Sequence, residues 1–216
     1  GLSLGSRLFG TLTERFANPQ RIYGLLEIAV GLYAFLFLPG IRFVERLHSA
    51  AFPYVYDIPH LLNLMRILIA GLAILLPTLL MGGTIPLVTQ ALAGSRLSVG
   101  RDVGRLYALN TLGAASGSFL SAFVIIPHWG LHWTFYIGGV VNIGVGVVAV
   151  LLRPVPPALD SEPPGSPFEK GPATSLSGSQ SLWALSAFFF TGLLSMVYEN
   201  AWTRALVLVF GTSIYA

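Results

Sequence analysis

The sequence contains no cysteine and few charged residues. The absence of cysteine excludes disulfide bonds and metal sites built on thiolates. Only 10% of the 216 residues are Asp, Glu, Lys or Arg, whereas an ordinary soluble domain carries about 25%. Hydrophobic residues make up 54% of the chain. This shortage of charge predicts an integral membrane protein in contact with a lipid bilayer.

The sequence also lacks a basic cluster. The net charge is +3, but the basic residues are scattered singly between apolar runs, which excludes a nucleic-acid-binding surface. They serve better to orient the protein in its membrane. The basic residues near Arg15 and Arg21, those from 96 to 105 and those in 153–170 all fall on one side of the predicted spans. The positive-inside rule places that side in the cytoplasm.

Signatures of enzymes and of exported proteins are missing as well. No Ser-His-Asp arrangement, pair of catalytic carboxylates or phosphate-binding loop stands out, so we predict no catalytic residue and no cofactor. The histidines lack metal-ligand spacing, so we predict no metal site. They are His48, His60, His128 and His132. No charged region precedes the first apolar run, which excludes a signal peptide. Because the chain starts at Gly1 inside that run, we expect a fragment of a longer protein.

Long apolar segments predict an all-α, polytopic bundle of transmembrane helices. The expected spans are 1–13 (the closing half of a helix), 22–38, 60–92, 103–126, 132–152 and a last one that begins near 182. Pro39-Gly40 is expected to end the second span, Pro77 to kink the third, and Pro127 to Gly130 to form a tight turn. Residues 153–181 are rich in Pro, Ser and Gly, which predicts a flexible linker.

Small residues recur four positions apart in two of the predicted spans. This spacing lets helix backbones approach closely in lipid. We therefore predict helix packing at Gly5, Gly10, Gly113 and Gly117.

Two charges interrupt the last apolar span. Glu199 and Arg204 are five residues apart, so on one helix they point to different faces, and each needs a partner from another helix. Counting residues along the spans places Arg66 at a similar depth, near the outer interface. We predict that Glu199 lies within polar reach of Arg66 or of the neighbourhood of Arg204. The alternative is that these side chains only support helix ends, with the arginines reaching to the interface.

A second polar network is expected toward the cytoplasmic side. Arg7, Glu27, Arg105 and Asn110 fall at comparable depth in their spans and could contact one another. Three tyrosines of the predicted spans, Tyr23, Tyr107 and Tyr198, either line a cavity or lie at an interface.

Several ordered motifs together resemble a known family. They are Gly5-Ser6-Arg7-Leu8-Phe9-Gly10, Tyr23-Gly24-Leu25-Leu26-Glu27, Pro77-Thr78-Leu79-Leu80-Met81-Gly82-Gly83-Thr84-Ile85-Pro86, Gly104-Arg105-Leu106-Tyr107-Ala108-Leu109-Asn110-Thr111-Leu112-Gly113-Ala114 and Tyr198-Glu199-Asn200-Ala201-Trp202-Thr203-Arg204. This set resembles the membrane region of bacterial fused proteins that join a major-facilitator-like bundle to a spermidine-synthase-like domain.

The resemblance implies two related helical halves. It makes 1–152 the first half-bundle without its first helix, 153–181 a cytoplasmic linker and 182–216 the first helix of the second half. It also implies a bacterial inner membrane. The catalytic domain of that family is not in this chain, so we expect no aminopropyltransferase activity from it. Remaining helices of the same protein, or neighbouring membrane subunits, are the expected protein partners.

Three functions are compatible with these features. The chain could anchor or regulate a spermidine-synthase-like domain at the cytoplasmic face of the membrane. It could instead be a transporter-like bundle for polyamines or another small cationic solute, with Glu27 and Glu199 attracting the cation. A structural subunit of a larger membrane complex is the third possibility. Fold-level resemblance by itself does not decide among them.

Overall fold

A computed structural model describes residues 1–12, 18–55, 59–93, 99–152 and 178–210, and these parts contain helices and no strand. The elements are α1 (Leu2–Leu12), α2 (Pro19–Val55), α3 (Pro59–Ala93), α4 (Val99–Phe119), a π-helical segment η2 (Leu120–Ile125), α5 (Ile126–Leu151) and α6 (Gly178–Phe210). The all-helical prediction is therefore confirmed for the described residues. The predicted linker lies outside them up to residue 177, and α6 begins at Gly178, slightly before the expected boundary.

Four stretches of the described chain are long and apolar enough to cross a membrane. They are Pro19–Val44, Leu64–Gln90, Gly104–Leu151 and Leu182–Val207. Large apolar side chains are exposed along them, including Leu72, Phe123 and Leu151. Such a surface is stable against lipid and not against water, so the chain is an integral membrane protein.

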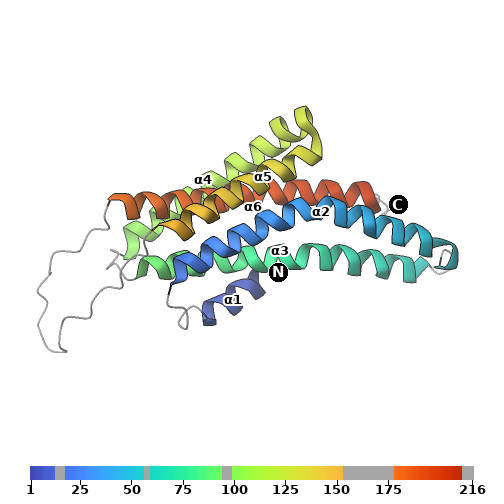
Figure 1. The fold of residues 1–216 in the computed structure, drawn as a ribbon, viewed down its shortest axis with the longest axis horizontal. Helices are drawn as coiled ribbons and strands as arrows, with labels where there is room; N and C mark the ends of the chain where they lie inside the picture. Colours follow the sequence, from blue (N-terminus) through green and yellow to red (C-terminus); the bar gives the residue numbers. More distant parts are fainter. Residues whose placement is uncertain (13–17, 56–58, 94–98, 153–177, 211–216) are drawn as a thin grey trace, which may run out of the picture.

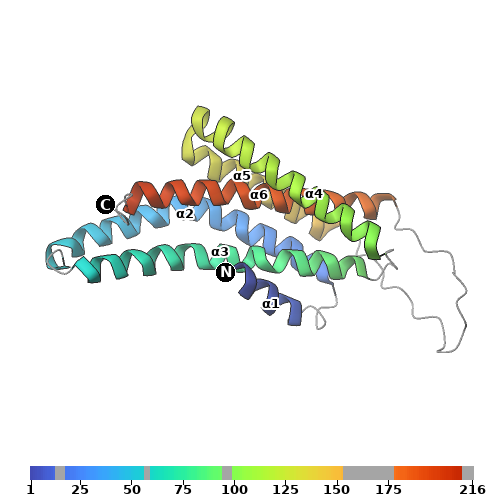
Figure 2. The ribbon, with the colours of Figure 1, turned by 180° about the vertical axis from the view of Figure 1, so that it is seen from behind.

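The helices form two connected layers (Figures 1 and 2). Helix α2 packs against α5 on one side and against α3 on the other, while α6 packs mainly against α4 and also contacts α5 and α3. The main packing partner of the short helix α1 is α3. The C-terminal ends of α1, α3 and α5 and the N-terminal ends of α2, α4 and α6 lie at one end of the bundle (Figure 1). The basic regions predicted to share one side adjoin these ends.

The predicted end of the second span at Pro39-Gly40 is wrong. Helix α2 continues through both residues to Val55. A proline inside a helix removes one hydrogen bond, but a membrane helix tolerates this single loss because ending the helix in lipid would leave several backbone groups without partners. Helix α3 contains Pro77 and Pro86 within its length, and the kink expected at Pro77 stays a prediction.

The predicted turn at Pro127 to Gly130 is confirmed as a reversal of the chain. Gly130 has φ 79° and ψ 176°, a conformation that glycine adopts readily and other residues rarely do. The apolar stretch Gly104–Leu151 is 48 residues long, more than one crossing needs, and it folds back here as a hairpin of α4 and α5 (Figure 2).

Replacing Gly130 with alanine is expected to destabilise the hairpin by about 1–3 kcal/mol, because a Cβ is strained at this φ and ψ. The loss would be measured as a lower unfolding midpoint in detergent, followed by circular dichroism. Gly144→Ala is the matched control: Gly144 lies within α5, and its added Cβ would meet no atom within 4 Å. Equal destabilisation by the two variants would contradict the prediction.

The predicted packing glycines divide into two groups. A Cβ on Gly5 would lie 2.0 Å from the Leu79 carbonyl oxygen of α3, and Cβ atoms on Gly113 and Gly117 would lie 2.0 and 2.1 Å from carbonyl oxygens of α6. At these three positions only glycine permits the backbones to touch. A Cβ on Gly10 would meet nothing within 4 Å, so no close helix approach requires glycine there.

Candidate polar site between α2, α5 and α6

Glu27 is a buried carboxylate inside a membrane-spanning helix. It lies in the span Pro19–Val44 and is only 4% exposed. Tyr23, Glu27, Val30 and Ala34 are all buried and recur at intervals of three or four residues, so they form the inward-facing stripe of α2. Glu27 is thus built into the contact surface of the helix rather than placed at its solvent end.

Hydroxyl groups surround this carboxylate. Thr191 of α6 donates a hydrogen bond from Oγ1 to Glu27 Oε1 at 3.4 Å, and the Tyr23 hydroxyl lies 3.3 Å from the same Thr191 oxygen. Because a threonine hydroxyl has a single proton, Tyr23 must donate to Thr191 when Thr191 donates to Glu27. The result is a directed chain from Tyr23 through Thr191 to Glu27 that ties α2 to α6.

No cationic side chain balances Glu27. In the part of the chain that the structure describes, its polar neighbours are Tyr23 and Thr191, and no Lys or Arg forms an ion pair with it. An ionised carboxylate without a cation is very costly in a membrane interior. A proton or a bound cation must therefore neutralise the group.

Two further polar side chains lie at this junction without partners. Asn142 of α5 is 1% exposed, and both atoms of its amide are buried without a hydrogen bond among the described residues. The Tyr198 hydroxyl of α6 is in the same situation. Each unmade hydrogen bond of this kind costs about 1–3 kcal/mol.

Helix contacts place these side chains near Glu27. A Cβ added to Gly31, one turn after Glu27, would lie 3.2 Å from the Asn142 Cβ, so Asn142 faces α2. A Cβ added to Gly138, one turn before Asn142, would lie 3.0 Å from the Tyr198 ring. Three helices thus direct polar groups toward one buried region.

Stacked aromatic rings fill the space beyond Tyr198. Its ring stacks on Trp202 at a centroid distance of 5.5 Å and an interplanar angle of 14°. Phe135 of α5 and Phe37 of α2 continue the packing, with their centroids 4.8 Å apart. The indole Nε1 of Trp202 is buried and has no hydrogen-bond partner among the described residues. The polar region is therefore sealed on this side by apolar contacts.

A separate polar contact fastens α6 to the π-helical segment. Asn200 donates from Nδ2 to Ser121 Oγ at 2.8 Å, and its amide also lies 3.5 Å from the Ser118 carbonyl oxygen. Segments of π-helix widen the backbone and recur at functional sites. Here Asn200 bonds to Ser121 inside the π-helical segment, which links α6 to the chain just after α4.

The outer charges predicted from the sequence are not brought together. Glu199 and Arg204 are exposed on α6. Arg66 is half-buried, and its Nε has no hydrogen-bond partner among the described residues. No ion pair between Glu199 and either arginine exists in the described chain, so the expected contact is not formed.

The inner network predicted around Glu27 is not the one the structure forms: the polar neighbours of Glu27 are Tyr23 and Thr191. No hydrogen bond joins Glu27 to Arg7 or Asn110 within the described ranges. Arg7 is exposed on α1, and Arg105 is exposed on α4. Asn110 lies on α4, where its backbone carbonyl contacts Gly192 of α6 and its Oδ1 is buried without a hydrogen bond.

Sequence reasoning missed Thr191 and Asn142. The available signal was a polar residue inside an apolar span, but it applies equally to threonines that bond to their own helix, as Thr78 does. Only the packing of α2 against α5 and α6 distinguishes a polar residue that faces another helix from one that bonds within its own helix.

Comparison with known proteins yields no relative for this chain: no family model, no curated protein and no solved structure matches it.

Proposed function

We propose that this chain is a transporter-like membrane bundle that binds a small cationic solute at Glu27. The observation that carries the proposal is the buried Glu27 carboxylate, which has hydroxyl neighbours and no cationic side chain in the described residues. Asn142 and Tyr198 offer further hydrogen-bonding groups that are otherwise unsatisfied. A ligand ammonium would neutralise the carboxylate and donate hydrogen bonds to the buried oxygens of Asn142 and Tyr198.

The site lies where relative movement of helices would expose it. The contact from Thr191 to Glu27 joins α6 to α2, and α6 follows the long segment 153–177 that separates it in sequence from α5. A cation that replaces the Thr191 contact weakens one link between α2 and α6. A ligand changes the balance between two arrangements of the helices only if it binds them with different affinity. Here the arrangement in which Thr191 bonds to Glu27 would compete with the cation, and the arrangement without that bond would not.

Uptake of labelled spermidine and putrescine into proteoliposomes tests the proposal. Liposomes that contain the wild-type protein are expected to take up more labelled polyamine than empty liposomes. Glu27→Gln is expected to lower this uptake about tenfold or more, because a charged hydrogen-bonded contact is lost. Asn142→Leu is expected to lower uptake while leaving the fold intact, since it removes an amide without partners.

Glu199→Gln is the matched control, because it makes the same chemical change at an exposed carboxylate. Its uptake is expected to stay within about twofold of wild type. Background uptake by the wild type, or equal loss in the Glu27 and Glu199 variants, would contradict the proposal.

A second candidate is an anchor or regulator for a spermidine-synthase-like domain at the cytoplasmic face of a bacterial inner membrane. The tight glycine contacts between α4 and α6 favour it, because backbones in direct contact resist the sliding that transport requires. In that case Glu27→Gln leaves solute uptake unchanged, whereas removal of the bundle releases the synthase activity of the longer protein from the membrane fraction. A role as structural subunit of a larger complex stays a prediction.

A further inference from the structure

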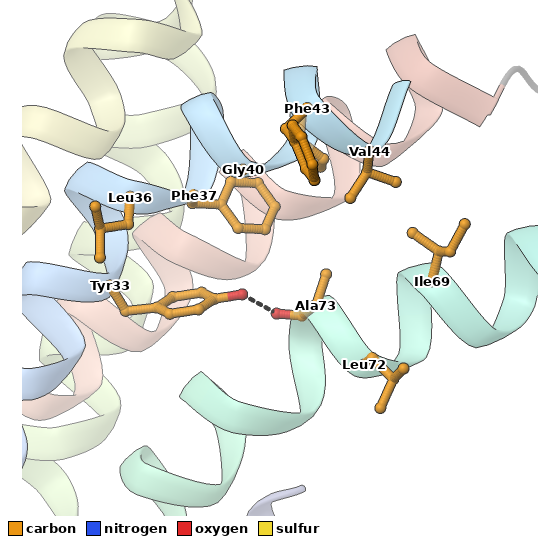
Figure 3. A pocket seen from close by; sticks show the side chains of 10 residues that line it. Tyr33, Leu36, Phe37, Gly40, Phe43, Val44, Ile69, Leu72 and Ala73 are labelled. Carbon is orange, nitrogen blue, oxygen red and sulfur yellow. Dashed lines mark hydrogen bonds between the residues drawn. The ribbon is translucent and has the colours of Figure 1, made fainter. Parts of the chain in front are cut away.

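An apolar groove of about 390 Å³ runs between α2 and α3, away from the Glu27 site. Figure 3 shows Tyr33, Phe37 and Gly40 of α2 on one side, with Ile69, Leu72 and Ala73 of α3 on the other. Its volume falls in the range of small-ligand sites, roughly 300–1,000 Å³. Its walls are almost entirely hydrocarbon.

The groove opens onto the surface that faces the bilayer. Leu36 and Leu72 line it, and each is 67% exposed, as are the large apolar side chains elsewhere on the membrane surface. The polar atom of Tyr33 is already used, since its hydroxyl donates to the Ala73 carbonyl oxygen (Figure 3). The groove therefore offers dispersion contacts and no free hydrogen bond, which suits an acyl chain.

An arginine without a hydrogen-bond partner at its Nε in the described chain lies on α3 about one turn before the first lining residue of that helix. Arg66 precedes the lining residue Ile69 by three positions, so it shares that face of α3 about 4.5 Å further along the axis. It lies near the start of the span Leu64–Gln90, where its Nε is buried without a hydrogen-bond partner in the described chain. A guanidinium at this depth needs an anionic acceptor, and its planar fork matches a phosphate.

We propose that the α2–α3 groove binds an anionic phospholipid, with an acyl chain along Phe37, Gly40 and Ile69 and the lipid phosphate on Arg66. The order of the parts agrees with this ligand: the charge sits toward the membrane interface at the start of the span, and the hydrocarbon contacts follow deeper along α3. Another helix in the groove would satisfy the apolar walls but would leave Arg66 without an acceptor unless it carried a carboxylate at that level.

Native mass spectrometry of the full chain in detergent tests the proposal with a mixture of equal amounts of phosphatidylglycerol and phosphatidylcholine. The wild type is expected to retain phosphatidylglycerol preferentially. Arg66→Gln is expected to lower that preference about fivefold, as expected for one basic residue acting on an anionic lipid. Gly40→Leu is expected to release both lipids, because the new side chain enters the groove, where a Cβ on Gly40 meets no atom within 4 Å.

Two controls separate these effects from general ones. Gly71→Leu adds the same side chain to an exposed face of α3 that also has open space, and it is expected to retain lipid as the wild type does. Arg42→Gln removes an exposed charge that does not line the groove, and it is expected to keep the preference for phosphatidylglycerol.

Three results would overturn the proposal. The first is an unchanged lipid preference in Arg66→Gln. The second is equal lipid loss in Gly40→Leu and Gly71→Leu. The third is dissociation of a dimer by Gly40→Leu without loss of lipid, which would make the occupant a second copy of the chain.

Discussion

Replacing Gly117 with leucine is expected to separate α4 from α6 and to cost roughly 3 kcal/mol or more, since overpacking against rigid backbone is at the upper end of such effects. A Cβ at this position would lie 2.1 Å from the Leu193 carbonyl oxygen, far inside van der Waals contact. The obstructing atom belongs to the helix backbone, so no rotation of a side chain relieves the clash. The two helices must move apart along their whole contact.

The same interface contains reciprocal glycine contacts. A Cβ on Gly113 would lie 2.0 Å from the Phe189 carbonyl oxygen, and a Cβ on Gly192 of α6 would lie 2.0 Å from the Asn110 carbonyl oxygen. Close backbone approach is the main source of helix association in lipid, because apolar side chains gain little by leaving lipid for a neighbouring helix. Loss of one contact therefore removes the neighbouring ones as well.

The Gly117 prediction is measured by unfolding in mixed micelles, with circular dichroism as the signal. Gly104→Leu is the matched control, because Gly104 lies on the same helix and its added Cβ would meet nothing within 4 Å. Leucine is a better helix former than glycine, so this control is expected to be neutral or stabilising. Comparable stability of the Gly117 and Gly104 variants would show that α4 and α6 are not in backbone contact.

Replacing Glu27 with lysine is expected to destabilise the bundle by about 3–5 kcal/mol, the range for an uncompensated buried charge. The new ammonium would meet Tyr23 and Thr191, whose hydroxyls are neutral, and the described residues around Glu27 include no carboxylate to balance it. The longer side chain would also disturb the packing of α2 against α6. The expected result is a loss of folded protein from detergent extracts, measured by size-exclusion chromatography.

The control for charge reversal is Glu199→Lys. Glu199 is exposed on α6, so its replacement is expected to change stability by less than about 0.5 kcal/mol. If Glu27→Lys were recovered as well as Glu199→Lys, Glu27 would have to be reachable by water, and the account of the site as a buried carboxylate would fail.

Much of the fold follows from the sequence because a membrane restricts the possibilities. Apolar runs of sufficient length must be helices, since every backbone polar group has to be satisfied within the segment. The hairpin at Gly130 and the packing role of Gly113 were predicted on local grounds and are found. The end of α2 was not, because Pro39-Gly40 ends a helix in water but not in a membrane span.

For the candidate functional residues, too, part of the result could be predicted from the sequence and part could not. That Glu27 and Glu199 are unusual could be read from the sequence, since each is a carboxylate in an apolar segment. Their different fates could not: Glu27 is 4% exposed and contacts α6, whereas Glu199 is exposed and without an ion pair in the described chain. Helical periodicity assigns a residue to a face, but which face meets another helix depends on contacts between segments far apart in sequence.

The sequence by itself therefore determined the class of protein, the helical spans and the presence of a few costly polar groups within them, because composition and segment length act locally. Tertiary structure alone decided that Thr191 donates to Glu27 across 164 positions, that the Asn142 amide and the Tyr198 hydroxyl are buried without hydrogen-bond partners among the described residues, and that an apolar groove forms between α2 and α3. Those relations arise from where glycine contacts let backbones meet, and no local pattern specifies them.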